Sequence, residues 1–251
     1  MASKNQIKLV KSLGRKKNRR ELGLFVAEGR KIVAEGLHSG LEAEMLFCLN
    51  SVSGQEEFQK AQAIDEETMS RLTLLSNPSE ALAVFKIPAG IENPKPEQLL
   101  ERCQSSPLLL YLDEIKDPGN LGTLIRIADW FGMPALLCSE TSVDTFNPKT
   151  VQSAMGSLFR LPVYRLGKEL LQSSVGNSRE IYTADLDGTS IWEIPRASER
   201  PAVVIIGSES HGPGADAFAL SSHRITIPGS GSAESLNAAV SGGIISAALL
   251  R

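Results

Sequence analysis

Residues 108–132 read LLLYLDEIKDPGNLGTLIRIADWFG, and this stretch decides which class of fold the rest of the chain must fit. An uninterrupted apolar run ends at Asp113, Asp-Pro-Gly turns the chain, and a helix is expected to begin close to Asn120. A strand without polar alternation is typical of a parallel sheet that is covered on both faces. The stretch therefore predicts a strand–turn–helix unit of an α/β protein.

The same pattern continues to the end of the chain. Further strand-like runs are expected at residues 134–140, 161–166, 180–186, 202–208 and 224–229, and helical patterns at residues 147–159 and 235–251. Apolar strands that alternate with helices predict a parallel sheet with helices on both faces. Ligands of such sheets gather at the carboxyl ends of the strands, so the candidate site lies just after these runs.

A second, smaller α/β unit is expected from Ile7 to about Phe85, where helical and strand patterns alternate. The segment after it, KIPAGIENPKPEQ at residues 86–98, is rich in proline and favours an extended linker. We therefore expect an N-terminal domain at residues 1–88, a linker at 89–106 and a second domain at 107–251.

The composition is that of a globular protein with a substantial core, because 42% of the 251 residues are hydrophobic. No apolar run is long enough to cross a bilayer, and charges occupy the place of a signal peptide's apolar stretch, so a cytoplasmic protein is expected. Cys48, Cys103 and Cys138 show neither paired nor metal-ligand spacing. They predict reduced cysteines, no disulfide and no zinc site.

The net charge of −3 hides a basic N-terminus, since residues 1–20 contain no acid. The basic residues are Lys4, Lys8, Lys11, Arg15, Lys16, Lys17, Arg19 and Arg20. Such a cluster would serve for contacts to nucleic-acid phosphates. The alternatives are a solvated tail or an organelle transit peptide, and the continuation into a folded domain disfavours the latter.

Three strand-end segments carry the candidate chemistry, and each has a simpler structural interpretation. Asn120 is more often a helix cap, and Arg126 more often a surface or ion-pair residue. Gly207 and Glu209 in AVVIIGSESHGPGADAF (202–218) could belong only to a tight turn. Asn237 in RITIPGSGSAESLNAAVSGGIISAALLR (224–251), like the neighbouring Ser235, could simply cap the last helix. The chain lacks GxGxxG, which argues against a dinucleotide oxidoreductase.

Taken together and in this order, DPGNLGTLIRIADWFG (117–132), IIGSESHGPG (205–214) and IPGSGSAESLNAAVSGGI (227–244) resemble the motifs of the SpoU/TrmH family of RNA ribose methyltransferases. The resemblance covers about residues 107–251. GLFVAEGRKIVAEGLHSG (23–40) is similar to the small RNA-binding, ribosomal-protein-like domain that precedes the catalytic domain in several rRNA-modifying members. The resemblance implies a trefoil-knotted SPOUT domain, a homodimer formed through the C-terminal domain, and S-adenosylmethionine as cofactor.

The resemblance also implies roles for individual residues. Main-chain groups around Gly207, Ile227 and Leu236 would hold S-adenosylmethionine. The residues that would face the reacting ribose are Asn120, Arg126, Glu209, Ser235 and Asn237. The chain departs from the common family pattern at Ser210 and His211, where glycine is usual, and at Ala238-Ala239, where Val-Ser is usual.

The expected reaction is methyl transfer to a ribose 2′-hydroxyl in RNA, in rRNA before tRNA, without a metal. The family favours Arg126 as the activating residue. Because arginine stays protonated in proteins, we expect it to stabilise a developing alkoxide and not to act as a base. The alternative function is a non-catalytic RNA-binding or ribosome-assembly factor that keeps the cofactor pocket.

Overall fold

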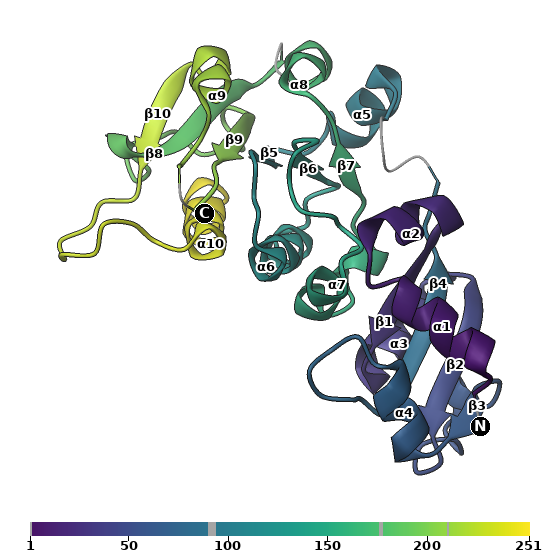
Figure 1. The fold of residues 1–251 in the computed structure, drawn as a ribbon. Helices are drawn as coiled ribbons and strands as arrows, with labels where there is room; N and C mark the ends of the chain where they lie inside the picture. The colour runs from purple at the N-terminus through teal and green to yellow at the C-terminus, as the bar shows by residue number, and fades with distance from the viewer. Residues whose placement is uncertain (1, 90–93, 176–177, 210) are drawn as a thin grey trace. The chain divides into compact units, whose positions relative to one another are not determined.

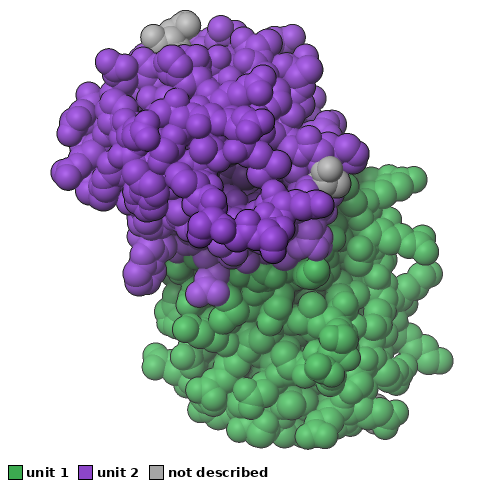
Figure 2. Space-filling model, turned by 90° about the vertical axis from the view of Figure 1, so that its left-hand side faces the viewer, with its two compact units in different colours: residues 1–89, 144–160 green, residues 90–143, 161–251 purple. Residues whose placement is uncertain are grey.

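The computed structural model describes residues 2–89, 94–175, 178–209 and 211–251. The chain divides into two compact units, each with its own sheet (Figure 1). Unit 1 comprises residues 1–89 and 144–160, and unit 2 comprises residues 90–143 and 161–251, coloured separately in Figure 2. The chain therefore enters unit 1 twice, the second time with a short segment from the middle of the sequence.

Unit 1 is built on a four-stranded sheet in the order β1-β4-β2-β3. Its strands are β1 (Leu24–Glu28), β2 (Ala43–Leu49), β3 (Gln62–Ile64) and β4 (Ala81–Lys86). Strand β4 is antiparallel to both neighbours, whereas β2 and β3 are parallel. The helices are α1 (Lys4–Ser12), α2 (Lys16–Leu22), α3 (Arg30–His38), α4 (Glu66–Leu72) and α7 (Pro148–Ala154), with 3-10 turns at Glu56–Phe58 and Ser157–Phe159.

The two faces of this sheet have separate cores, as the alternation of side chains along a strand requires. Val26 packs with Val10, Leu13 and Met69 of the helices on one face. Its neighbour Phe25 lies in an aromatic cluster with Phe85, Phe146 and Phe159, with ring centroids 4.8 to 6.3 Å apart. Two of these four rings come from residues 144–160, so that segment completes the core of unit 1.

The basic N-terminus is folded into helices α1 and α2, not a loose tail. One member of the basic set is a structural residue: Arg19 is only 2% exposed. Its Nε donates to Asp144 Oδ2 at 2.8 Å and its guanidinium also donates to the Leu13 carbonyl at 2.7 Å. The expectation that Arg19 contacts phosphates is therefore wrong, because its charge is already compensated inside unit 1.

Unit 2 contains a six-stranded, all-parallel sheet in the order β10-β8-β9-β5-β6-β7. Its strands are β5 (Leu108–Leu112), β6 (Leu136–Cys138), β7 (Val163–Arg165), β8 (Glu180–Ser190), β9 (Ala202–Ile206) and β10 (His223–Thr226). Strands β5 and β9 are buried throughout, as the apolar runs predict. The predicted α/β class and parallel sheet are confirmed.

Helices cover both faces of this sheet. Helices α5 (Pro96–Cys103), α8 (Lys168–Ser174) and α9 (Ala215–Leu220) lie on one side, and α6 (Pro118–Trp130) and α10 (Ala238–Leu249) on the other (Figure 1). Helix α10 approaches α6 closely at Gly242, where a Cβ atom would lie 2.5 Å from Leu124 Cδ2. The small residues of the last helix thus serve packing within unit 2.

Helix α5 differs from the extended linker expected at residues 89–106. Pro96 starts the helix at its first turn, where a missing N–H costs nothing. Leu99 and Cys103 are fully buried and belong to the same core cluster as Leu109 and Val203 of the sheet. The proline content misled the prediction because it marks only the start of an amphipathic helix; residues 90–93 lie outside the described residues.

The three cysteines are unpaired and buried, as predicted. Burial raises the pKa of the Cys138 thiol to about 12 and also raises the pKa values of Cys48 and Cys103. The trefoil knot stays a prediction, since strand order and helix layers do not by themselves establish it.

Candidate active site

The candidate site lies where strands β5 and β9 end side by side. The two strands pair in register, with Leu112 opposite Ile206, and the Asp113 amide extends the ladder by donating to the Ile206 carbonyl at 2.8 Å. The order of strands along the chain reverses around this pair, because β6 and β7 lie beyond β5 whereas β8 and β10 lie beyond β9. A crevice at such a reversal is the usual ligand site of open α/β sheets.

Three of the five predicted catalytic residues are linked by their side chains at this point. Asn237 Nδ2 donates to Asn120 Oδ1 at 2.9 Å, and Asn120 Nδ2 donates to Glu209 Oε1. The three residues come from three different motifs, 89 and 117 positions apart along the chain. The two hydrogen bonds therefore connect the segments that follow β5, β9 and β10.

Asn120 and Asn237 are each held in place by hydrogen bonds at the start of a helix. Asp117 caps α6 by accepting from the Asn120 amide at 2.9 Å, so Asn120 is not the cap that the simpler interpretation suggested. Asn237 does cap its helix, because its Oδ1 accepts from Ala239 and Val240 amides. The same side chain still reaches Asn120 through Nδ2, so capping and site formation are compatible at this position.

The loop after β9 is closed tightly at its base. A Cβ atom on Gly207 would lie 2.1 Å from the Pro213 nitrogen, a distance that no side chain can occupy. The Gly212 amide donates to the Ser208 carbonyl at 2.9 Å, and Gly212 adopts a φ of 65°. The backbone is thus folded on itself beside Glu209, as the cluster of glycines predicts.

The segment after β10 presents main chain and apolar side chains to the outside. Ile227 is half-buried and Leu236 is 48% exposed. Residues 229–236 make no backbone–backbone hydrogen bond within the described chain. Free main-chain groups beside an exposed leucine suit a ligand that is bound mainly through the backbone.

Arg126 and Ser235, the other two predicted catalytic residues, do not join the side-chain network. Both are exposed and neither makes a side-chain hydrogen bond or ion pair within the described part of the chain. Arg126 lies six residues after Asn120 on α6, roughly 9 Å further along the helix axis at 1.5 Å per residue. Its guanidinium is therefore available to an external ligand.

Two further predicted features can be located. His211 is exposed in the loop after β9, and its amide donates to Ser208 Oγ at 3.4 Å; Ser210 lies outside the described residues. Ala238 and Ala239 are buried at the start of α10, where small side chains fit.

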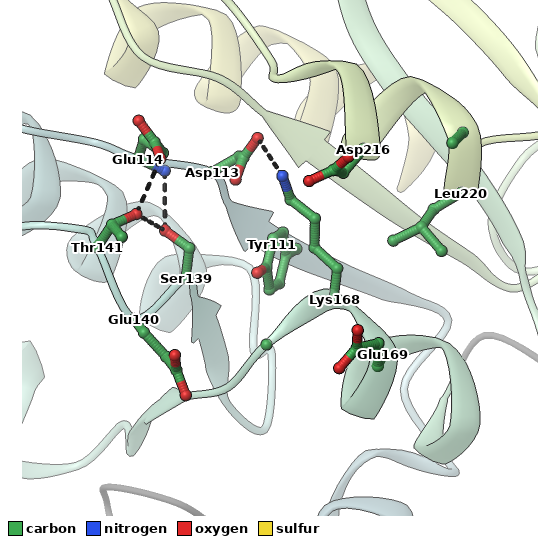
Figure 3. A pocket seen from close by; sticks show the side chains of 12 residues that line it. Tyr111, Asp113, Glu114, Ser139, Glu140, Thr141, Lys168, Glu169, Asp216 and Leu220 are labelled. Carbon is green, nitrogen blue, oxygen red and sulfur yellow. Dashed lines mark hydrogen bonds and ion pairs between the residues drawn. The ribbon is translucent and has the colours of Figure 1, made fainter.

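Sequence reasoning missed an ion pair between a buried aspartate and a half-buried lysine at the edge of the same site. Asp113 and Lys168 lie 3.1 Å apart in a cleft of about 450 Å³ at the carboxyl ends of β5, β6 and β7 (Figure 3). None of the eight predicted site residues lines this cleft. Asp113 could have been noticed as the first polar residue after a buried strand, whereas nothing in the sequence distinguishes Lys168.

No group of three or more His, Cys, Asp or Glu residues suited to a metal occurs in the described ranges. Among these residues, no helix is long and apolar enough to cross a membrane.

Comparison with known proteins confirms the family that the motifs predicted. The SpoU rRNA Methylase family matches residues 107–247, and the MRM3-like substrate binding domain matches residues 4–83. The chain belongs to the SpoU rRNA methylase family and thus to the RNA methyltransferases.

Individual relatives agree along nearly the whole length. The 23S rRNA (guanosine(2553)-2′-O)-methyltransferase RlmP of Bacillus subtilis is 32% identical over 97% of this chain and 96% of its own. A solved structure described as an RNA methyltransferase of the TrmH family from Porphyromonas gingivalis is 34% identical, with a TM-score of 0.82 over 99% of this chain and 98% of its own. The AdoMet-bound rRNA methyltransferase of Sinorhizobium meliloti is 27% identical, with a TM-score of 0.83 over 99% and 96% of the two chains.

Proposed function

We propose that this protein transfers a methyl group from S-adenosylmethionine to a ribose 2′-hydroxyl of RNA, in rRNA before tRNA. The observation that carries the proposal is the hydrogen-bonded series Asn237–Asn120–Glu209, which joins all three motifs at the ends of β5, β9 and β10. The relatives named above, which are rRNA methyltransferases or RNA methyltransferases, support both the reaction and rRNA as substrate.

The residues present fit the cofactor. The folded backbone at Gly207 leaves no room for a side chain, and the main chain of residues 229–236 is free for hydrogen bonds to a ligand. Ile227 and the exposed Leu236 supply apolar surface for a flat ring. When bound, S-adenosylmethionine supplies a methyl group that its sulfonium charge has already activated.

The protein's own residues then have to orient and activate the hydroxyl. We assign to Arg126 the stabilisation of negative charge on the 2′-oxygen, which gains the methyl group and loses its proton to a phosphate oxygen or to water. Asn120, Glu209 and Asn237 orient the groups around that oxygen, and we assign Ser235, two residues before Asn237, to the same ribose. No metal is required, so activity should survive EDTA.

RNA binding is assigned to the N-terminal domain. We place it at residues 1–88, to which unit 1 adds the segment 144–160, and the methyltransferase domain at the rest of residues 107–251. Helix α5, in the stretch expected as a linker at 89–106, packs into the core of unit 2. Lys4, Lys8, Arg15, Lys17 and Arg20 are exposed on or beside helices α1 and α2, where they can contact phosphates.

A homodimer through the C-terminal domain has a specific surface to support it. Val240 is 50% exposed on α10, Trp130 is 86% exposed on the adjacent helix α6, and Leu236 precedes α10. We infer that these exposed apolar side chains take part in the interface. The unpaired cysteines fit a reducing compartment, and we infer that the protein works in the cytoplasm.

The non-catalytic alternative is less well supported. A vestigial pocket would have no need of the linked Asn120, Glu209 and Asn237 side chains, yet all three are present and hydrogen-bonded.

The test is transfer of tritium from labelled S-adenosylmethionine to protein-free rRNA or tRNA from the source organism. We expect label in rRNA, and a loss of roughly 10- to 100-fold for Asn120→Ala, the scale at which one positioning contact acts. Thr123→Ala, an exposed change one turn later on α6, is the matched control. Cofactor binding without transfer to either RNA would support the non-catalytic alternative instead.

A further inference from the structure

A buried carboxylate ties the loop after β9 to the end of β5. Asp113 is only 1% exposed, and its Oδ2 accepts from the Gly214 amide at 3.0 Å. Gly214 ends the loop whose base is folded at Gly207 and whose middle carries Glu209. The segments after β5 and β9 are therefore joined twice, once through Asp113 and Gly214 and once through Asn120 and Glu209.

The charge of this carboxylate is balanced from a third strand end. Lys168 follows β7 at the start of α8, and its Nζ lies 3.1 Å from the same Asp113 Oδ2. Figure 3 shows the lysine reaching across the cleft to the aspartate, with Asp216 and Glu169 nearby. Burying a carboxylate without a cation is strongly unfavourable, so the ion pair and the hydrogen bond to the Gly214 amide depend on each other.

These contacts lead to an assignment that rests on the proposed function of the site. We propose that Asp113, with Lys168 as its counter-ion, is a positioning residue for methyl transfer: it holds Gly214, and through it the backbone packed against Gly207, in the shape that binds S-adenosylmethionine. Neither residue touches the reacting groups. Each acts through Gly214 and the backbone of the loop.

The test compares single and double substitutions in the full-length protein. Asp113→Asn removes the negative charge that pairs with the Lys168 ammonium, and Lys168→Met leaves the buried carboxylate without its cation. Each should weaken S-adenosylmethionine binding roughly tenfold, the scale of one charge-assisted hydrogen bond. The KM for S-adenosylmethionine should rise by the same factor, while kcat at saturation and the KM for RNA change much less.

The double variant Asp113→Asn/Lys168→Met gives the sharper result. The asparagine oxygen can still accept from the Gly214 amide, and neither an unpaired carboxylate nor an unpaired ammonium remains at this position. Affinity for S-adenosylmethionine should therefore recover relative to either single variant, although no charge has been restored. Lys168→Arg, which keeps the cation, should also bind close to the wild type.

Glu140→Gln is the matched control, because Glu140 lines the same cleft but follows β6 and does not tie the loop to β5. An equal loss of affinity in this control would overturn the assignment in favour of a general effect of the cleft's charge. Unchanged affinity in both single variants would overturn it as well. Failure of the proposed function is distinguishable, since the wild-type protein would then transfer no methyl group to RNA, whereas the affinity for S-adenosylmethionine is measured by calorimetry without RNA.

Discussion

Gly207 lies where the neighbouring backbone leaves no room for a side chain. A Cβ atom there would lie 2.1 Å from the Pro213 nitrogen and 2.2 Å from the Gly212 carbonyl carbon, and neither is the end of a flexible side chain. Gly207→Ala must therefore open the loop that carries Glu209. We expect this variant to lose S-adenosylmethionine binding in calorimetry while its far-ultraviolet circular dichroism stays that of a folded protein.

Gly167→Ala is the control for that change. Gly167 follows β7 in the same unit, a Cβ atom there would meet no atom within 4 Å, and its φ of −72° suits any residue. Unimpaired cofactor binding by Gly207→Ala would contradict the role given to this loop.

At the scale of single residues, the sequence predicted the side chains that strand-end motifs expose. Asn120, Glu209 and Asn237 lie together because each follows a strand of the same parallel sheet. The ion pair of Asp113 with Lys168 could not be predicted, since it joins the ends of β5 and β7 through a contact with no short-range signal. The burial of Arg19 escaped prediction because it depends on Asp144, 125 residues away.

At the scale of elements, helix α2 and the segment 144–160 hold each other in unit 1. The Arg19 guanidinium is 2% exposed and the Asp144 side chain 9% exposed in this pair. Arg19→Met would leave the carboxylate buried without a partner, which typically costs about 3–5 kcal/mol. We expect a loss of that size in the free energy of unfolding of unit 1, measured by urea denaturation with a probe in that unit.

Lys17→Met provides the comparison on the same helix. Lys17 forms an exposed pair with Glu21 at 3.7 Å, and such pairs contribute only about 0.3–0.5 kcal/mol. Equal destabilisation by the two substitutions would show that the buried pair of Arg19 and Asp144 stabilises unit 1 no more than an exposed pair does.

Element boundaries were predictable where hydrophobic periodicity was strong and unpredictable where turns decide them. Strands β5, β6 and β9 lie within the predicted apolar runs and are buried throughout, whereas β8 continues to Ser190, past the run expected at residues 180–186. The helix expected at residues 147–159 instead ends at Ala154, since Met155 and Gly156 adopt φ values of 50° and 89°. That turn leaves room for Glu35, which pairs with Arg160 at 2.8 Å.

At the scale of the whole molecule, the proposed dimer would bury apolar side chains that are exposed on α6 and α10. Val240→Glu would place a charge on the exposed face of α10 that the proposed interface buries. We expect the wild-type protein to sediment as a dimer and this variant as a monomer in analytical ultracentrifugation at micromolar concentration. Ser173→Glu is the matched control, because Ser173 is exposed on α8, away from helix α10. A wild-type monomer would contradict the dimer.

The fold of the whole chain could be predicted only through the resemblance of its ordered motifs to a family. Periodicity predicted a parallel sheet with helices on both faces, but it could not predict that β9 inserts between β8 and β5. Nor could it predict that residues 144–160 complete the aromatic core of unit 1, because that depends on contacts between distant segments.

The measurement that tests the central claim most directly is where the transferred methyl group is found in the RNA. After incubation of rRNA with tritiated S-adenosylmethionine, alkaline hydrolysis cleaves every linkage whose 2′-hydroxyl is free. A 2′-O-methyl group blocks that cleavage, so we predict label in alkali-resistant dinucleotides, and its loss when Arg126→Ala replaces the wild type. Label in ordinary mononucleotides would place the methyl group on a base and contradict the account.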